Sequence, residues 1–153
     1  MIVTHNLDDL HERAGNHEVI HMHGELTSAW CMACGMRWIW KLDLGDNPPC
    51  PGCQQTGMRP DIVWFGEPVY QLAEINAAVD SCELFVVIGS SGAVHPAAGL
   101  TARAKAHGAR TVLLNLEDDR EGGRFDEVRL GPAASIVPSW VADVLEELKS
   151  EDD

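Results

Sequence analysis

The chain has 153 residues, of which 45% are hydrophobic and 23% are charged, as is ordinary for a globular protein with a core of its own. No apolar run approaches the length of a membrane span, and the N-terminus lacks the basic and apolar blocks of a signal peptide. A cytoplasmic protein without a membrane partner is therefore expected. The formal net charge of −13 argues against a nucleic-acid partner, because binding phosphates requires clustered Lys and Arg.

The N-terminal part of the chain predicts short elements. Ile2 and Val3 begin an apolar strand, and residues 6–14 combine a helix N-cap with apolar residues at helical spacing. Residues 19–23 alternate as a short strand does, and Gly24 is expected to end that strand.

The second half of the chain predicts helices that alternate with strands. Helices are expected at 70–79, at 96–107 and from Pro138 onward. The continuous apolar runs at 84–88 and 110–115 have the length of strands buried on both faces of a parallel sheet. This alternation predicts an α/β fold with a doubly wound parallel sheet.

Polar residues follow three of the predicted strands, at positions 4–6, 89–91 and 115–117. Ligands of doubly wound sheets bind at the carboxyl ends of the strands, so these clusters are candidates for a cofactor site. A helix N-cap, a strand-ending turn and the start of a polar loop would explain the three clusters without a ligand.

Four of the five cysteines form two Cys-x-x-Cys pairs separated by 15 residues, Cys31 with Cys34 and Cys50 with Cys53. In a reducing compartment this spacing is typical of zinc, and four thiolates leave no open position on the metal, so a structural zinc ion is expected. Free thiols and a generic interaction module are the alternatives. Cys82 precedes an apolar run and is expected to be a small buried hydrophobe.

Seven motifs follow one another along the chain: Thr-His-Asn-Leu-Asp at 4–8, His-Met-His-Gly at 21–24, the two cysteine pairs, Arg-Pro-Asp-Ile-Val-Trp-Phe-Gly-Glu at 59–67, Gly-Ser-Ser at 89–91 with Val94 and Pro-Ala-Ala at 96–98, Asn-Leu-Glu at 115–117, and Gly-Pro-Ala at 131–133. In this order they resemble the motifs of the sirtuins, the NAD-dependent protein lysine deacylases. The stretch His-Met-His-Gly-Glu-Leu is most similar to bacterial sirtuins of the class that includes desuccinylases.

The resemblance implies a deacetylase or desuccinylase that consumes NAD and releases nicotinamide and O-acyl-ADP-ribose. His23 matches the family's catalytic base, which accepts a proton from a ribose hydroxyl. An ordinary His pKa of about 6.5 suits a base near neutrality. A lone His before a glycine is otherwise more often structural, and His21 is not expected to share the role.

The resemblance also implies binding residues. An acyl-lysine protein or peptide is expected to add as a strand and to contact Val63, Phe65, Gly66 and Glu67, although this segment would be plain core in a structural interpretation. The residues expected to contact the cofactor are His5, Asn6, Leu7, Asp8, Gly89, Ser90, Ser91, Asn115, Leu116, Glu117 and Ala133.

The sequence departs from the family at two points. The family's opening segment, with its Gly-Ala-Gly phosphate loop and the first strand of the sheet, has no counterpart here. Three alternatives follow: the gene starts upstream, another segment completes the sheet, or the chain is inactive. His5 stands where the family has Gln; it can still hydrogen-bond a ribose, and it can titrate. The alternative function is a non-catalytic, zinc-stabilised fragment that binds a peptide or a nucleotide.

The expected architecture is a partial Rossmann-like, doubly wound parallel sheet with an inserted small zinc-ribbon module. Residues 1–25 and 59–153 are assigned to the NAD-binding portion, and residues 26–58 are assigned to the zinc-binding module. The expected cofactors are NAD and Zn²⁺.

Overall fold

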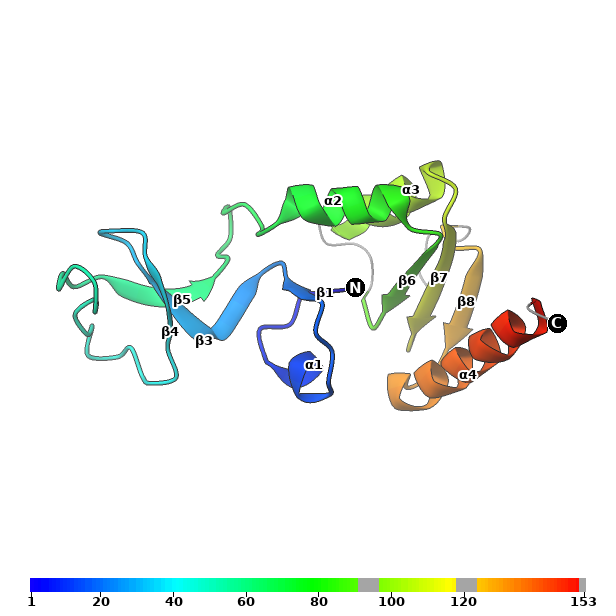
Figure 1. Cartoon of the computed structure of the whole chain (residues 1–153), viewed down its shortest axis with the longest axis horizontal. Helices are drawn as coiled ribbons and strands as arrows, with labels where there is room; N and C mark the ends of the chain where they lie inside the picture. Colours follow the sequence, from blue (N-terminus) through cyan, green and yellow to red (C-terminus); the bar gives the residue numbers. More distant parts are fainter. Residues whose placement is uncertain (91–96, 118–123, 152–153) are drawn as a thin grey trace. The chain divides into compact units, whose positions relative to one another are not determined.

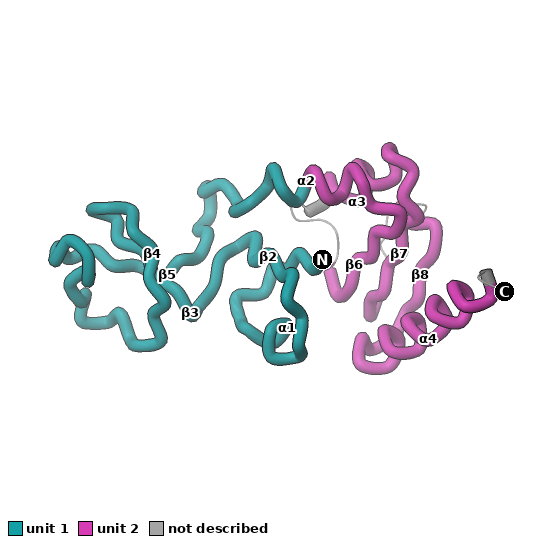
Figure 2. Tube along the Cα trace, in the orientation of Figure 1, with its two compact units in different colours: residues 1–75 teal, residues 76–153 magenta. Residues whose placement is uncertain are grey.

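The computed structural model describes residues 1–90, 97–117 and 124–151 (Figure 1). The chain divides into two compact units, residues 1–75 and 76–153, and each is described by itself (Figure 2). The elements in chain order are β1 (Ile2–Thr4), α1 (Leu10–Arg13), β2 (Val19–His21), β3 (Gly24–Cys31), β4 (Arg37–Ile39), β5 (Met58–Ile62), α2 (Leu72–Ser81), β6 (Leu84–Ile88), α3 (Ala97–Ala106), β7 (Arg110–Asn115), β8 (Glu127–Leu130) and α4 (Ala133–Glu151).

The first unit contains a parallel pair of strands and an antiparallel three-stranded sheet. β1 pairs with β2, and the second sheet has the order β4-β3-β5. Because β2 ends at His21 and β3 begins at Gly24, His23 lies in the short link between the two sheets. The predicted base is therefore positioned by both sheets of this unit.

The second unit contains a parallel sheet of order β6-β7-β8 with helices on both of its faces (Figure 1). β7 is the central strand, and its residues from Thr111 to Leu114 are buried. Val112 and Leu114 pack with Trp140 of α4. Since side chains alternate along a strand, Leu113 faces the opposite side of the sheet, which α3 covers. Helices on both faces are the pattern of a doubly wound sheet.

The prediction that β6 is buried on both faces is wrong. β6 lies at an edge of its sheet, and no strand pairs with its other side in the described part of the chain. Leu84 and Ile88 are accordingly 38% and 48% exposed. The apolar run is therefore correct as a strand, but its burial depends on a neighbour that its own residues do not reveal.

Several predicted boundaries also differ from the structure, and two of the differences concern the role given to a Gly or a Pro. Gly24 opens β3 instead of ending a strand. The last helix was expected to begin at Pro138, but it begins at Ala133, and Pro138 lies inside it. Its first turn is already closed by a hydrogen bond from the Ile136 N–H to the Pro132 carbonyl at 3.1 Å. The proline that precedes this helix is thus Pro132, whose fixed φ suits a helix start.

Parallel strands flanked by helices confirm the predicted α/β class. The assignment of residues 26–58 to a zinc module, and of 1–25 with 59–153 to one NAD-binding portion, stays a prediction. Among the described helices, none combines the length and the apolar character that crossing a membrane requires.

Candidate functional site

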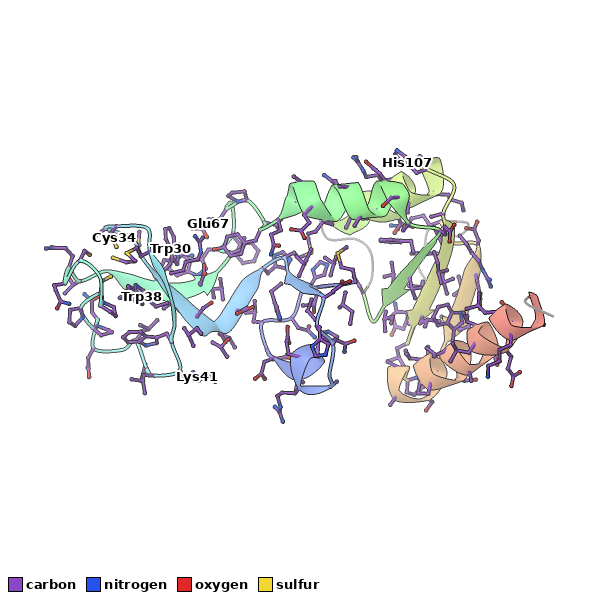
Figure 3. The ribbon with its side chains drawn as sticks, in the orientation of Figure 1. Trp30, Cys34, Trp38, Lys41, Glu67 and His107 are labelled. Carbon is purple, nitrogen blue, oxygen red and sulfur yellow. The ribbon has the colours of Figure 1, made fainter. Side chains whose placement is uncertain are left out.

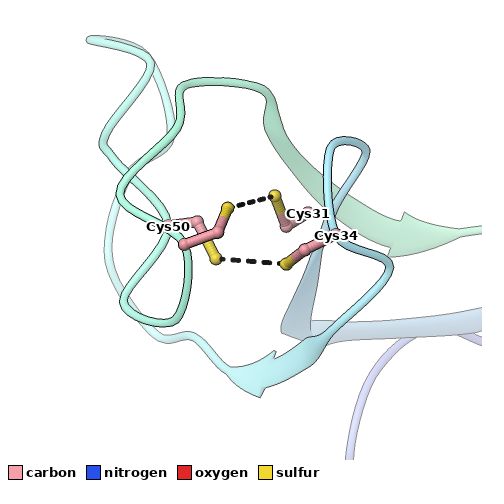
Figure 4. A group of neighbouring side chains, drawn as sticks. Cys31, Cys34 and Cys50 are labelled. Atoms are coloured by element: carbon pink, nitrogen blue, oxygen red, sulfur yellow. Dashed lines mark hydrogen bonds between the residues drawn. The ribbon is translucent and has the colours of Figure 1, made fainter.

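The four paired cysteines converge beside the antiparallel sheet of the first unit (Figures 3 and 4). Cys31 ends β3 and Cys34 lies in the turn to β4, whereas Cys50 and Cys53 lie in the turns before β5. The Sγ atoms of Cys31 and Cys53 are 3.7 Å apart, those of Cys34 and Cys50 are 3.8 Å apart, and all four lie within 4.8 Å of one another.

These distances fit a single zinc ion. Zinc binds each thiolate sulfur at about 2.3 Å, which in a tetrahedral site places the sulfurs about 3.8 Å from each other. The cysteine cluster, Cys31, Cys34, Cys50 and Cys53, can therefore hold zinc with little movement of the chain. With four sulfur ligands the metal would have no open position, so its role would be structural.

A small apolar core supports the cysteine cluster. Its buried members and the side chains packed against them are Ala29, Cys31, Cys50, Met58, Trp38, Trp40, Leu44 and Cys53. Trp38 and Trp40 thus cover the cysteine cluster. Trp30 instead contacts Arg37 and Arg59, whose Cζ atoms lie 5.6 and 5.2 Å from the centre of its ring (Figure 3).

The thiols of the cysteine cluster differ in acidity. Backbone N–H groups of Cys53 and Gly52 lower the pKa of Cys50 to about 6. The Met36 N–H favours the thiolate of Cys34, but desolvation and the neighbouring thiols outweigh it and raise the pKa of Cys34 to about 12. The first thiolate forms near neutrality, and metal binding must displace the remaining protons.

His23, the predicted base, contacts His5, the first residue of the predicted cofactor loop. His5 follows β1 and His23 follows β2, and these strands are parallel neighbours, so the residues after them lie close together. His23 Nε2 is 3.1 Å from His5 Nδ1, and the ring centres are 4.9 Å apart at an angle of 55°. Burial, and secondarily the nearby His23, lower the pKa of His5.

The remainder of the predicted cofactor loop is held through its backbone. The Leu7 carbonyl accepts a hydrogen bond from the Leu26 N–H of β3 at 2.9 Å. Asp8 Oδ1 accepts from the Leu10 N–H at 3.1 Å, so this carboxylate supports the first turn of α1. The N-cap position is Asp9, whose side chain makes no cap bond, so the N-cap interpretation of Asn6 and Asp8 is wrong. Asn6 is exposed. Loop residues 5–8 are therefore fixed in place while polar side chains stay accessible.

His21 anchors the same loop from β2. Only 7% of it is exposed; its Nδ1 lies 3.0 Å from the Asn6 carbonyl and its Nε2 lies 2.9 Å from Glu12 Oε1. A Glu25 carboxylate oxygen is 3.9 Å from Nε2. Burial opposes the charged ring, but the Asn6 carbonyl and the two carboxylates outweigh burial and raise the pKa of His21. His21 therefore holds the loop against α1 and contacts neither His5 nor His23 by hydrogen bonds.

This arrangement predicts that part of the stability depends on pH. Because the folded-state pKa of His21 is raised above 6.5, its contribution is complete below pH 6.5 and is lost as pH rises through the raised value. The pKa of Glu12 is lowered, chiefly by its hydrogen bond with His21, so the carboxylate's contribution is lost only as pH falls below 4.5. The pair therefore stabilises most strongly between these two limits.

We expect the free energy of unfolding of the unsubstituted chain, relative to the His21→Gln variant, to decrease as pH rises above 6.5. Urea unfolding at a series of pH values measures this difference. His17→Gln is the control, because His17 is exposed in the link between α1 and β2. If the free energy of unfolding of His21→Gln depended on pH in the same way as that of the unsubstituted chain, the role of His21 would be contradicted.

The segment predicted to bind substrate begins beside His23. Gly24 of β3 pairs with Ile62 of β5, and the next residue, Val63, donates its N–H to the His23 carbonyl at 2.9 Å. Gly24 permits this approach, because its φ is +84° and a Cβ there would lie 2.0 Å from the Asp61 carbonyl oxygen. Predicted base and predicted substrate segment are thus joined by a backbone hydrogen bond.

Arg59 holds the 63–67 turn in shape, a role that its place in the motif did not reveal. Its guanidinium, in a residue only 6% exposed, donates to both Glu67 carboxylate oxygens at 2.7 and 3.0 Å and to the Ile62 carbonyl at 2.8 Å. The Trp64 ring centre lies 3.7 Å from Arg59 Cζ, and the Trp64 N–H donates to Glu67 at 2.9 Å. The bonds from Arg59 and Trp64 lower the pKa of Glu67 to about 2. The sequence offered one signal for this ion pair, because the motif begins with Arg59 and ends with the oppositely charged Glu67.

Phe65 stands in solvent on this turn. Its relative exposure is 109% and that of Trp64 is 52%, so the core interpretation is wrong for both, whereas Val63 is partly buried. Gly66 has a φ of +88°, the left-handed conformation that lets the chain reverse before Glu67. A turn fixed by Arg59 thus presents aromatic surface outward.

The other predicted cofactor residues gather at one edge of the sheet in the second unit. They end or follow the parallel strands, or open the helix after them, and are Gly89, Ser90, Asn115, Leu116, Glu117 and Ala133. The Gly89 N–H donates to the Leu114 carbonyl at 3.0 Å, and the Gly131 N–H donates to the Asn115 carbonyl at 2.9 Å. These bonds tie the strand ends together. Ser91, the remaining predicted contact, lies outside the described residues.

A polar cavity of about 420 Å³ is present elsewhere in the first unit and was not predicted. Its lining residues are Val19, His21, Gly24, Glu25, Ser28, Arg37, Asp61, Tyr70 and Gln71. Asp61 accepts hydrogen bonds from Arg37 Nε at 2.9 Å and from the Tyr70 hydroxyl at 2.8 Å. Polar groups that line the cavity thus hydrogen-bond to one another. Neither His23 nor Phe65 is among the lining residues.

Fold and site together define an α/β protein with a cluster of four cysteines that can hold a metal ion and with polar residues after its parallel strands. The Sir2 family model matches residues 1–96. The chain is 49% identical over 148 residues to the "NAD-dependent protein deacylase SIR2rp3" of Leishmania major, covering 95% of this chain and 61% of the relative. It is 46% identical over 151 residues to the "NAD-dependent protein deacylase" of Escherichia coli K12, covering 98% and 54%.

Solved structures agree with these relatives. A Sir2 homologue in complex with NAD superimposes with a TM-score of 0.86 at 31% identity, covering 95% of this chain and 58% of that chain. Sir2Af2 bound to a myristoylated histone peptide gives 0.79 at 35% identity, covering 97% and 66%. The chain belongs to the Sir2 family. It spans between half and two thirds of the length of these curated relatives.

Proposed function

We propose that this chain forms part of the catalytic core of an NAD-dependent protein lysine deacylase, acting as a deacetylase or desuccinylase. One observation carries the proposal: His23 contacts both the cofactor loop and the substrate segment. Its ring Nε2 lies 3.1 Å from Nδ1 of His5, and its backbone carbonyl accepts the Val63 N–H at 2.9 Å. The names of the relatives, and the NAD and acylated peptide in the titles of the structural neighbours, support the same reaction class.

NAD supplies the ribose carbon that takes up the acyl oxygen and the nicotinamide that leaves. His23 would accept the proton of a ribose hydroxyl whose oxygen attacks the imidate carbon left after nicotinamide departs, and addition of one water molecule then breaks the bond to the lysine nitrogen, giving free lysine and O-acyl-ADP-ribose. The 63–67 turn offers main-chain groups for a peptide that adds as a strand, and Phe65 offers apolar surface to the acyl-lysine. The carboxylate of Glu117, after a parallel strand, can accept hydrogen bonds from ribose hydroxyls.

The NAD diphosphate requires a further segment. No Gly-Ala-Gly sequence occurs among the 153 residues, and the matched relatives are longer than the aligned region. β6 offers an edge on which Leu84 and Ile88 are exposed and no described strand pairs. We propose that a strand of this further segment pairs with β6 and that the glycine loop after it binds the diphosphate.

Nicotinamide release from NAD with acetyl-lysine and succinyl-lysine peptides tests the function. We expect zinc-loaded protein to release nicotinamide when it is supplied with a sirtuin N-terminal segment that carries the glycine loop. His23→Ala should lower kcat by about 100-fold or more, the usual contribution of a general base, with zinc content unchanged. His17→Ala is the control, since His17 is exposed in the link between α1 and β2. An unaltered rate in His23→Ala would contradict the role of His23.

A non-catalytic fragment that binds a peptide or a nucleotide is the second candidate. The absence of a Gly-Ala-Gly sequence favours it, because a glycine loop normally cradles the diphosphate. Calorimetric titration with the same peptides and with NAD separates the two functions. Binding without nicotinamide release, both with and without the added segment, would support the fragment.

We further propose a cytoplasmic location and no nucleic-acid partner. All five cysteines are free, and four of them form a group that could hold a metal ion, which suits a reducing compartment. The net charge of −13 disfavours binding to phosphate backbones.

A further inference from the structure

The two histidines of the site form a direct ring-to-ring hydrogen bond, in which His5 Nδ1 lies 3.1 Å from His23 Nε2. We propose that His5 is a positioning residue for His23: it accepts the Nε2 proton of His23 and so leaves His23 Nδ1 as the nitrogen that takes up a proton. The inference rests on the proposed role of His23 as the base. It concerns this chain in particular, because His5 stands where the sirtuin pattern has Gln.

The backbone holds both rings in place. The Met22 N–H donates to the Thr4 carbonyl at 3.1 Å, which continues the pairing of β1 and β2 up to the residues before each histidine. On its other side, the His23 carbonyl accepts the Val63 N–H at 2.9 Å. His5 and His23 therefore meet because three segments of the first unit are joined by backbone hydrogen bonds.

The bond requires one ring to donate and the other to accept. A neutral imidazole carries one N–H and one lone pair. If His5 donated, the lone pair of neutral His23 would be occupied at Nε2, and its Nδ1 would carry the proton, so no nitrogen would remain to act as a base. If His23 donates from Nε2, its Nδ1 lone pair is free. Only the second arrangement is compatible with base catalysis by His23.

The same arrangement favours the charged product of proton transfer. When His23 Nδ1 accepts a proton, the ring becomes an imidazolium whose Nε2–H still points at His5 Nδ1, and a hydrogen bond from a charged donor is stronger than one from a neutral donor. His5 must remain neutral to accept it. Burial, and then the neighbouring His23, lower the pKa of His5, which keeps its lone pair available.

Two substitutions separate this role from simple packing. His5→Phe keeps an aromatic ring but removes the acceptor, whereas His5→Gln keeps an acceptor oxygen. We expect His5→Phe to lose the preference of His23 for the Nε2–H form and His5→Gln to retain it. With the catalytic assembly described above, kcat of His5→Phe should be about 10-fold to 100-fold lower than kcat of His5→Gln, the usual effect of removing a partner that orients a ring.

The ring tautomers can be read by NMR without any turnover. Two-bond ¹H–¹⁵N correlation spectra of ¹⁵N-histidine-labelled, zinc-loaded full chain, recorded at a pH where both rings are neutral, identify which nitrogen carries the proton. Backbone amide spectra and zinc content show that each variant is folded. If His5→Phe fails to fold, the unsubstituted chain and His5→Gln still carry the test.

The proposal requires the Nε2–H form of His23 in the unsubstituted chain and its loss in His5→Phe. A His23 that is protonated at Nδ1, or an identical tautomer in His5→Phe, would overturn it. Failure of the deacylase function would show as absent nicotinamide release while the tautomer result stood. The two inferences can thus fail separately.

Discussion

Replacing Cys50 with Ser is expected to remove zinc and to unfold the antiparallel sheet of the first unit. The apolar core around the cysteine cluster is small, and two of its four buried members are themselves cysteines, Cys31 and Cys50. Binding of a structural zinc ion contributes about 10–16 kcal/mol in small zinc domains, whereas a whole domain is usually stable by only about 5–15 kcal/mol. Losing the metal therefore outweighs what this core supplies.

Metal analysis and thermal unfolding check this expectation. The unsubstituted chain should bind one zinc ion, and Cys50→Ser should bind none and lose the cooperative transition of the first unit. Cys82→Ser is the matched control: Cys82 is partly buried outside the cluster, where its Sγ donates to the Val79 carbonyl at 3.3 Å. A Cys50→Ser chain that kept both zinc and its melting temperature would refute a structural metal.

The cysteine cluster could be predicted from the sequence because its determinants are local. Each Cys-x-x-Cys pair sets the distance between its own sulfurs, and a tetrahedral ion constrains the remaining geometry. The structure brings all four sulfurs within 4.8 Å, as this spacing predicts. Which tryptophans pack against the cluster was harder to predict. Trp38 and Trp40 do so, whereas Trp30 lies in β3 opposite Arg59 of the neighbouring β5 and contacts its guanidinium.

The burial of the strands could be predicted only in part. The run at β6 and the run at β7 are both apolar, yet Val112 in β7 is fully buried while Ile88 in β6 is 48% exposed. The difference arises from position in the sheet, because β7 has a strand on each side and β6 has a described neighbour on one side only. The apolar residues of a strand indicate that the strand is to be buried, but they do not indicate which other segment of the chain covers it.

Contacts between distant residues account for what sequence reasoning missed at the site. His5 was assigned to the cofactor through the resemblance, but its bond to His23 follows from the parallel pairing of β1 and β2. Arg59 and Glu67 belong to one motif, and their bidentate ion pair becomes visible only when the chain reverses at Gly66. A motif identifies residues that act together, whereas the fold determines which atoms meet.

Gly24→Ala is expected to separate β3 from β5 beside the base while leaving the metal in place. The φ of +84° at Gly24 costs an L-residue roughly 1–2 kcal/mol. The added Cβ would lie 2.0 Å from the Asp61 carbonyl oxygen and 2.8 Å from Ile62 Cα, so backbone must move, which costs roughly 1–3 kcal/mol more. The Val63 N–H would then lose the His23 carbonyl, and the base would lose its fixed position relative to the substrate segment.

Gly15→Ala isolates the steric effect, because Gly15 has a similar φ of +93° and a Cβ added there would have no atom within 4 Å. Urea unfolding should therefore show a loss of about 1–2 kcal/mol for Gly15→Ala and a total of roughly 2–5 kcal/mol for Gly24→Ala. Zinc content should be unchanged in both, since Cys31 lies at the far end of β3 from Gly24. Nicotinamide release should fall only in Gly24→Ala. Equal stability losses in the two variants would mean that the close approach of β3 and β5 at Gly24 does not constrain the site.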